Sequence, residues 1–377
     1  MNWNELSELM DSITDRFGIP ACECLVTIGH DRVFYRASGF SDVKKTHPVS
    51  ERDLYWIYSL SKIFTCTAAL QLIERGLMKL NDPVSKFLPS WTNLTVKKGT
   101  FSVPCETQPT ILNLMTMTCG LNYNLATPGI VRLIKETNRK FSLRQVIDVL
   151  AREPLDFVPG EHFQYSLCHD VLGAVIEQAS GMMLEDYLRE NIKEPLGAAD
   201  LTFFPNKEQF SRFSTEYIYR EKSKLFTDAK LKNPFLFSPA FASGGAGICS
   251  NILDVSLLAD ALANGGVAAT GKTILSENSI NEMRKNWLTP EQQKDFNIMK
   301  PGPFCYGLGV QTLTSPVADL PAGEFGWDGA AGSFVLMDPN LRLSLVYTQH
   351  VLDHRYLVHT QLHPALRETL YRIVMNG

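Results

Sequence analysis

Segments that favour β-strands lie near both ends of the chain, and helical segments lie between them. Residues 22–31 and 32–40, CECLVTIGHD and RVFYRASGF, are two β-rich runs separated by a polar turn, which predicts a hairpin. After about residue 300 short strand patterns return, and residues 335–347, VLMDPNLRLSLVY, carry Asp-Pro-Asn at a second hairpin turn. The simplest fold that uses both sets of strands is one antiparallel sheet built from the two ends of the chain.

Helical patterns fill the middle of the chain and also flank the strands. The region from about residue 108 to 225 is mostly helical, and residues 251–266 form another helical pattern that ends in glycines. The chain closes with a helix that has Pro364 in its first turn. The first helix has one apolar face, made of Leu6, Leu9, Met10 and Ile13.

These patterns predict an α+β fold with two parts. Residues 1–60 and 235–377 are expected to form a domain with an antiparallel sheet flanked by helices. Residues 61–234 are expected to form a mostly helical domain, with the active site at the junction between the two. A chain of 377 residues is long enough for two domains.

Charge and hydropathy argue against several classes of partner. The net charge is −4 and there is no long basic run, so no nucleic-acid partner is expected. No apolar run reaches the ~18 residues that a membrane span needs. The N-terminus, MNWNELSELMDSITDRFG, is acidic and amphipathic and lacks the positive start and apolar core of a secretory signal. We therefore expect a cytoplasmic protein with no membrane partner; no pattern indicates its oligomeric state.

Cysteine and histidine spacing predicts neither disulfides nor a metal site. The eight cysteines form no C-x-x-C pair and are expected to be free buried thiols. Four histidines near the C-terminus have i, i+4 spacings but no HExxH context, and the predicted helix begins only after them: His350, His354, His359 and His363. His162 and His169 flank Tyr165 and are expected to be peripheral.

The segment YWIYSLSKIFTCTAALQLIERG, residues 55–76, sets Ser59 and Lys62 three apart at the start of an apolar helix that Gly76 ends. Its periodicity predicts one buried face, with Ile63, Leu70 and Ile73 facing inward. Residues i and i+3 share a helical face, so Lys62 Nζ can reach Ser59 Oγ. A second S-x-x-K match, Ser41 to Lys44, lies in a charged stretch without helical periodicity.

A serine hydroxyl becomes a nucleophile only when a base takes its proton, and a lysine can do so only if its pKa is lowered. The alternative is that Ser59 is a helix N-cap and Lys62 is solvated. The spacing alone leaves both interpretations open. No G-x-S-x-G elbow occurs, which argues against an α/β-hydrolase.

Two further segments help to decide between the two interpretations of Ser59 and Lys62. VPGEHFQYSLCHDVLG places Tyr165 between a Pro-Gly turn and a helix, and GWDGAAGSFVLMDP places a glycine-rich turn before a strand. With Ser59 and Lys62, in this order and spacing, they resemble the serine β-lactamase and penicillin-binding-protein family. The resemblance is strongest to its class C branch and the β-lactamase-like carboxylesterases. Further segments in family order extend it over nearly the whole chain, among them LQLIERGLMKLNDPVSKFLP and ASGGAGICSNILDVSLLADAL.

The resemblance implies a β-lactamase/transpeptidase-like fold and a role for each matched residue. Ser59 is the residue acylated, Lys62 helps to accept its proton, and Tyr165 acts as general base and then acid. The oxyanion hole is formed by the backbone N–H groups of Ser59 and Ala330. A phenol has a pKa of about 10, so we expect Lys62 to lower the pKa of Tyr165.

Two departures from the family pattern predict the substrate class. Leu167 stands where lactamases have the Asn of Y-x-N, and Trp327-Asp328-Gly329 stands where they have K-T-G or H-x-G. Leu167 cannot hydrogen-bond a β-lactam side chain, Trp327 supplies no cation for a substrate carboxylate, and Asp328 would repel one. Strand alternation predicts that Trp327 and Asp328 do not both face the site. Trp327 could instead serve only as packing beneath it.

The sequence therefore predicts a serine hydrolase that forms an acyl-enzyme on Ser59, most simply a carboxylesterase acting on uncharged esters. A β-lactamase or D-amino-acid peptidase is the alternative within enzymes. A non-catalytic penicillin- or acyl-binding module is the alternative outside them. The partner is a small-molecule ester or amide, and no cofactor or metal is expected.

Overall fold

The strands from the two ends of the chain form one antiparallel sheet, as expected from the sequence. The computed structural model describes residues 1–317 and 320–377. The sheet has seven strands in the order β2-β1-β13-β12-β11-β10-β9. β1 pairs with β13, with Leu25 opposite Val346, so N-terminal and C-terminal strands are neighbours. The strands are β1 (Ala21–Ile28), β2 (Asp31–Gly39), β9 (Phe304–Tyr306), β10 (Gln311–Leu313), β11 (Phe325–Asp328), β12 (Phe334–Asp338) and β13 (Leu343–Gln349).

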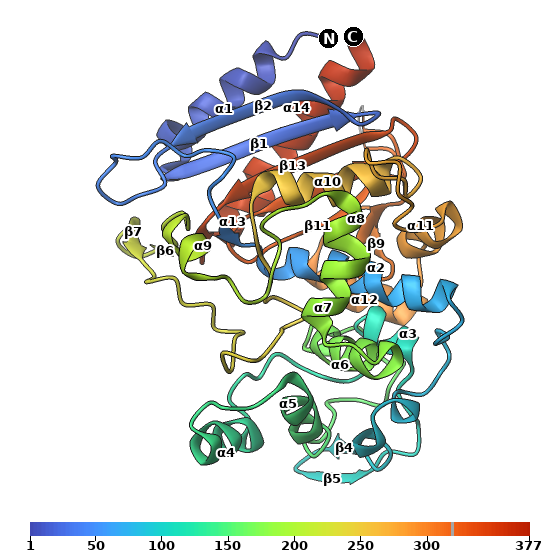
Figure 1. Ribbon diagram of the computed structural model, residues 1–377. Helices are drawn as coiled ribbons and strands as arrows, with labels where there is room; N and C mark the ends of the chain where they lie inside the picture. The colour runs from blue at the N-terminus through green and yellow to red at the C-terminus, as the bar shows by residue number, and fades with distance from the viewer. Residues whose placement is uncertain (318–319) are drawn as a thin grey trace.

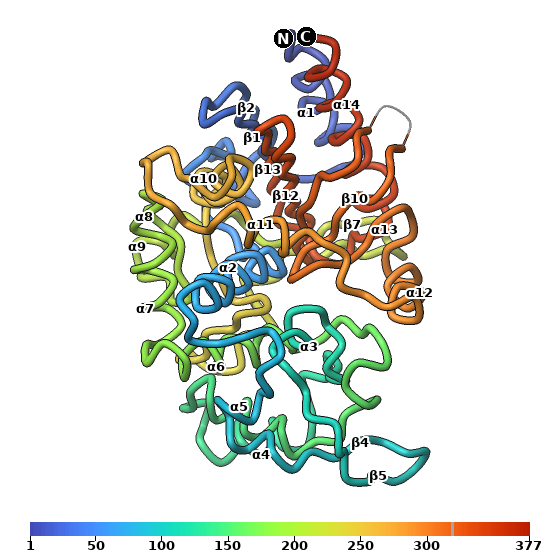
Figure 2. The backbone as a smooth tube through the Cα atoms, turned by 90° about the vertical axis from the view of Figure 1, so that its right-hand side faces the viewer, coloured from blue at the N-terminus to red at the C-terminus, as the bar shows by residue number. Residues whose placement is uncertain are grey.

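Strand alternation gives the sheet two apolar faces, and helices cover both. Val26 of β1 packs in the cluster under α1 (Asn4–Phe17) and α14 (His363–Asn376), whereas its neighbour Leu25 packs in the larger cluster on the other face. α10 (Ile252–Ala263) covers that second face and contacts β1, β12 and β13. Figures 1 and 2 show α1 and α14 side by side, with the two chain ends next to each other.

The rest of the chain is mostly helical and lies below the sheet in Figure 1. Figure 2 places α4 and α5 at the end of the molecule opposite α1 and α14. The remaining helices are α2 (Ser61–Glu74), α3 (Ile111–Met115), α4 (Pro128–Thr137), α5 (Leu143–Leu150), α6 (Cys168–Ser180), α7 (Leu184–Leu188), α8 (Glu194–Leu196), α9 (Lys207–Ser211), α11 (Glu277–Arg284), α12 (Pro290–Met299) and α13 (Arg355–Leu357). Among the described residues, no helix is both long enough and apolar enough to cross a membrane.

Helix α2 is the centre of the molecule and differs from its sequence prediction in two ways. The helix begins at Ser61, not Ser59, because a short 3-10 turn, Tyr58–Leu60, precedes it. Residues 61–72 are buried on every side, so the helix has no solvated face. Burial on all sides is typical of a core helix. Gly76, with φ of 70°, ends it as predicted.

Four short strand pairings were not predicted. β6 (Tyr217–Arg220) and β7 (Leu225–Asp228) fall in or beside the region expected to be helical, and β14 (Val351–Leu352) pairs with β6 in parallel. β3 (Tyr55–Trp56) pairs with β8 (Cys249–Ser250), just before the Ser59 turn. The fourth pairing joins β4 (Thr95–Lys98) to β5 (Phe101–Pro104). Pairs this short depend on long-range contacts, because the local sequence carries little strand periodicity.

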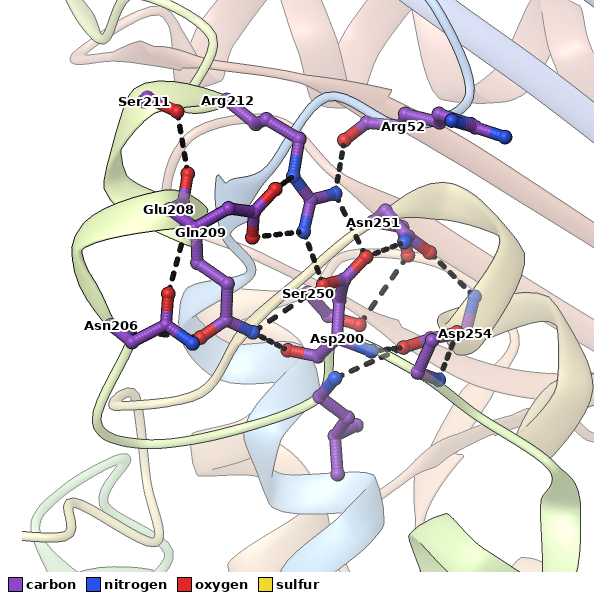
Figure 3. A network of polar contacts seen from close by, with 12 residues as sticks. Arg52, Asp200, Asn206, Glu208, Gln209, Ser211, Arg212, Ser250, Asn251 and Asp254 are labelled. Atoms are coloured by element: carbon purple, nitrogen blue, oxygen red, sulfur yellow. Dashed lines mark hydrogen bonds and ion pairs between the residues drawn. The ribbon is translucent and has the colours of Figure 1, made fainter.

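A polar network fixes the chain where it returns from the helical region to α10. The Asp254 carboxylate, in the first turn of α10, accepts hydrogen bonds from the backbone N–H groups of Ala199 and Leu201, each at 3.0 Å. Asp200 between them pairs with the Arg212 guanidinium and accepts from the Asn251 amide at 2.9 Å (Figure 3). Asp254 is buried, so these donors satisfy a carboxylate that has little access to water.

The cysteines agree with the expectation of free thiols. All eight are free and buried: Cys22, Cys24, Cys66, Cys105, Cys119, Cys168, Cys249 and Cys305.

Candidate active site

Ser59 and Lys62 lie together at the N-terminal end of α2. Lys62 Nζ donates to Ser59 Oγ at 3.1 Å, and the Lys62 side chain has no exposed surface. Leu60 occupies the N-cap position of α2, and no side chain caps the helix there. The interpretation of Ser59 as an N-cap with a solvated Lys62 is therefore wrong.

Burial makes the Lys62 ammonium a stronger acid than that of an ordinary lysine. Its other hydrogen bonds run to Tyr123 Oη at 2.9 Å and to the carbonyl oxygen of Gly245 at 2.6 Å. Burial lowers the pKa of Lys62 to about 7, although the nearby Asp170 carboxylate opposes the shift. A large fraction of this amine is thus neutral near pH 7 and able to accept a proton. Tyr123 was not predicted, because it stands in a loop, GLNYNLATPG, that carries no motif.

Tyr165 lies beside the pair but does not have the expected pKa. Its hydroxyl accepts a hydrogen bond from Trp327 Nε1 at 2.9 Å. Lys62 Nζ lies over the face of the Tyr165 ring, 4.7 Å from its centroid. Burial raises the pKa of Tyr165 well above its ordinary value, and hydrogen bonds with Ser59 and Trp327 only partly offset this. The expectation of a lowered pKa for Tyr165 is therefore wrong, and of the two residues Lys62 is the one available in its basic form at neutral pH.

The two residues of the predicted oxyanion hole line the same cavity. Ser59 and Ala330 both line it, and neither N–H donates to a backbone carbonyl among the described turns and loops. Gly329 holds the end of β11 against the Ser59 segment. A Cβ at this position would lie 2.6 Å from the carbonyl oxygen of Ile57 and 2.2 Å from Ser333 Oγ. Only glycine allows this approach.

The cavity has a volume of about 570 Å³ and is open to solvent on one side. Ser59, Tyr165 and the strand end Trp327–Ala330 form part of its wall. The other walls come from the segment after α12 and from the C-terminal helix: Met299, Lys300, Pro301, Phe304, Gln311, Phe334, Arg355, Tyr356, His359, Thr360, His363, Pro364 and Arg367.

Comparison with known proteins then settles the family. The family model described as Beta-lactamase matches residues 6–356. The chain belongs to the beta-lactamase family. This membership and the observed fold confirm the resemblance and the α+β architecture predicted from the sequence.

Relatives in the beta-lactamase family include an esterase and an acyltransferase. The chain is 29% identical over 344 residues to Esterase EstB from Burkholderia gladioli, covering 84% of this chain and 82% of that one. It is 26% identical over 343 residues to Acyltransferase calJ from Penicillium decumbens, covering 85% and 81%. The structure of EstCE1, titled a hydrolase with promiscuous acyltransferase activity, superposes with a TM-score of 0.80 at 23% identity, covering 98% of both chains.

One residue predicted to line the pocket of this beta-lactamase-family protein does not do so. Leu167 is buried in the large apolar cluster and precedes the first residue of α6. Its backbone N–H bonds the carbonyl oxygen of Asn122, at 3.4 Å. The chain turns into α6 directly after Tyr165, which directs position 167 into the core and away from the cavity.

Trp327 and Asp328 both line the cavity, against the expectation from strand alternation. Asp328 is the last residue of β11, where the strand gives way to a turn, so the alternation no longer holds. Trp327 also packs against Tyr306, with ring centroids 5.1 Å apart, so it contributes both to packing and to the Tyr165 hydrogen bond. Asp328 forms an ion pair with Lys300, and Lys300 Nζ lies 5.3 Å from the Trp327 ring centroid. Trp327 itself supplies no cation, but Lys300 places one beside it.

The C-terminal histidines lie on a longer helical run than predicted. Helical turns begin at Arg355 and continue into α14, so His359 and His363 share one face and point toward the cavity. With Asp328 they offer three ligand atoms within 4.8 Å of one another, a set that could bind a metal ion. Lys300 already pairs with this carboxylate, so a metal would have to displace it.

His162 and His169 do not line the cavity; His162 pairs with Asp295 on the surface and His169 is buried.

Proposed function

We propose that this protein is a carboxylesterase that forms an acyl-enzyme on Ser59. The observation that carries the proposal is the 3.1 Å contact between Ser59 Oγ and a fully buried Lys62, where Ser59 lines a cavity large enough for a small ester. Membership of the beta-lactamase family and the likeness to Esterase EstB support a hydrolase. A module that only binds would have no use for a buried amine with a pKa of about 7.

In the proposed reaction neutral Lys62 takes the proton of Ser59 Oγ as that oxygen attacks the ester carbonyl carbon. The developing oxyanion accepts hydrogen bonds from the N–H groups of Ser59 and Ala330, each contributing on the order of 3 kcal/mol. The proton passes to the leaving alkoxide, and the alcohol departs. Water then attacks the acyl carbon, its proton returns to Ser59 Oγ, and the carboxylic acid is released.

We assign Tyr165 to the delivery of the proton, not to its removal. Its hydroxyl interacts with Ser59 and accepts from Trp327, and its raised pKa keeps it protonated at neutral pH. A neutral phenol can donate its proton to the leaving oxygen and recover one from Lys62 in the same step. Trp327 fixes the direction of the phenol.

We also propose that the cavity lies between the two predicted domains, 1–60 with 235–377 and 61–234. Ser59 comes from the first segment, Tyr165 from the helical region, and Ala330 from the last segment. A site assembled from all three would form only in the folded chain.

The restriction to uncharged esters that the sequence predicted is not part of this proposal. It rested on Trp327, which supplies no cation, and on Asp328, which would repel a carboxylate, but Lys300 lies over the Trp327 ring and pairs with Asp328. The preference for esters over lactams remains, supported by the relatives.

The test is a substrate panel measured with the wild type and Ser59→Ala. We expect kcat/KM for a short-chain p-nitrophenyl ester to exceed that for nitrocefin and a penicillin, and every activity to disappear in Ser59→Ala. Faster turnover of a β-lactam than of every ester tried would support the lactamase alternative. Ester activity that survives in Ser59→Ala would exclude Ser59 as the nucleophile.

A further inference from the structure

Three cations, Lys300, Arg355 and Arg367, and one carboxylate, Asp328, line the cavity. Arg367 pairs with buried Glu324, and Lys300 pairs with Asp328. Arg355 also lines the cavity, but within residues 1–317 and 320–377 no carboxylate lies within ion-pair distance of it.

The charge of Arg355 acts on groups of the site. Arg355 is the first residue of α13 and lines the cavity, and its charge acts on both Tyr165 and His359. The unpaired charge of the cavity therefore resides on Arg355.

We propose that the cavity binds esters that carry a second, free carboxylate, and that Arg355 is the residue that pairs with it. The inference rests on the proposed esterase function and names the substrate class. A guanidinium presents parallel N–H donors that match a carboxylate in a bidentate pair. The single unpaired positive charge fits a monoanion; a phosphate dianion would need a second free cation.

In the family pattern the third sequence motif supplies the cation for a substrate carboxylate. In this protein the free cation comes from a different part of the chain. Position 327 is a tryptophan that bonds Tyr165, and the free charge comes instead from the start of the C-terminal helix. Tyr356 beside it is 80% exposed and adds an aromatic rim to the same side of the mouth.

The experiment compares matched esters that differ only in the free carboxylate. In one arm the acid part carries it: mono-p-nitrophenyl glutarate against its methyl-capped diester. In the other the alcohol part carries it: 4-(butyryloxy)benzoate against its methyl ester. We expect kcat/KM for the anion to exceed that of its capped partner about tenfold or more in one arm, which also shows on which side of the ester the subsite lies.

Three variants test whether Arg355 causes the preference for the anionic ester. Arg355→Met should bring the anion-to-capped ratio close to one, and Arg355→Lys should restore part of it. Arg372→Met, on the same C-terminal helix but outside the cavity and paired with Glu5, should leave the ratio unchanged. A ratio near one in the wild type in both arms, or a high ratio that survives in Arg355→Met, would overturn the proposal.

A binding measurement separates this proposal from the esterase function itself. Calorimetry on Ser59→Ala should detect tighter binding of monomethyl glutarate than of dimethyl glutarate, and the difference should vanish in the double variant with Arg355→Met. This readout needs no turnover, so it tests the anion subsite even if no ester is hydrolysed. Ester turnover combined with equal binding of the two ligands would leave the esterase standing and exclude the subsite.

Discussion

Lys62 Nζ lies 3.1 Å from Ser59 Oγ, and no part of the Lys62 side chain is exposed to solvent. A lysine in water is protonated at neutral pH and cannot act as a base. Burial brings the pKa of Lys62 to about 7, which is close to the optimum for general base catalysis at neutral pH. The predictions below follow from this pair and from the groups that surround it.

The pH dependence of catalysis should report the protonation of Lys62. Because only the neutral amine accepts the Ser59 proton, kcat/KM for p-nitrophenyl butyrate should rise as the pH increases through about 7 and level off above it. Initial rates read at the isosbestic wavelength of the product give the profile. A rate that falls as the pH rises through this range would mean that the charged lysine is the active form.

Replacing Lys62 by Met should change stability in a pH-dependent way. The pKa of Lys62 is 10.5 when unfolded and about 7 when folded, so the unfolded state binds more protons between these values and wild-type stability rises with pH. The free energy of unfolding of Lys62→Met minus that of wild type should therefore be largest near pH 7 and shrink toward pH 10. At 1.36 kcal/mol per pKa unit, this pH-dependent part is on the order of 4 kcal/mol. Urea denaturation at several pH values measures it, and a difference that does not vary with pH would contradict the lowered pKa.

Lys62→Met and Tyr165→Phe should each reduce turnover of a neutral ester by about 10²-fold or more, the range of general acid–base catalysis. The double variant should be little worse than the worse single one, because the two residues serve one proton path. Steady-state kinetics of the three variants form the cycle. Losses that multiply fully in the double variant would show that the residues act independently.

Gly329→Ala should damage catalysis without touching any catalytic side chain. The new Cβ would lie 2.6 Å from the carbonyl oxygen of Ile57, so β11 must move away from the Ser59 turn and carry the Ala330 N–H with it. Displacing one oxyanion donor should lower kcat by about 10²-fold with a smaller effect on KM. Gly99→Ala, in the β4–β5 turn with no atom within 4 Å, is the control and should retain normal kinetics. Equal kcat in Gly329→Ala and wild type would remove Ala330 from the mechanism.

The sheet could be predicted from the sequence because its signals are local. The β1–β2 and β12–β13 hairpins carry alternation and turn residues, and the pairing of β1 with β13 follows as the simplest way to join them. The same local reasoning fails for α2. Its apolar residues suggested one buried face, but packing between the sheet and α6 buries it on all sides.

The residues of the site also differ in whether local sequence signals reveal them. Ser59, Lys62 and Tyr165 stand in motifs whose spacing is visible in the sequence. Lys300 and Arg355 do not: one follows the end of α12 and the other begins α13, and only the tertiary fold brings them to the same cavity. The charge of the pocket, and with it the expected substrate class, could therefore not be predicted from motif positions such as Leu167 and Trp327.

The most direct test of the central claim is to identify the acylated residue. The protein is mixed with a p-nitrophenyl ester, quenched in acid within the steady state, digested, and analysed by mass spectrometry; a fluorophosphonate probe provides a stable parallel adduct. The account predicts that both the acyl group and the probe are found on Ser59, and that Lys62→Met slows formation of the two adducts. An adduct on any other residue, or full activity in protein whose Ser59 remains unmodified, would contradict it.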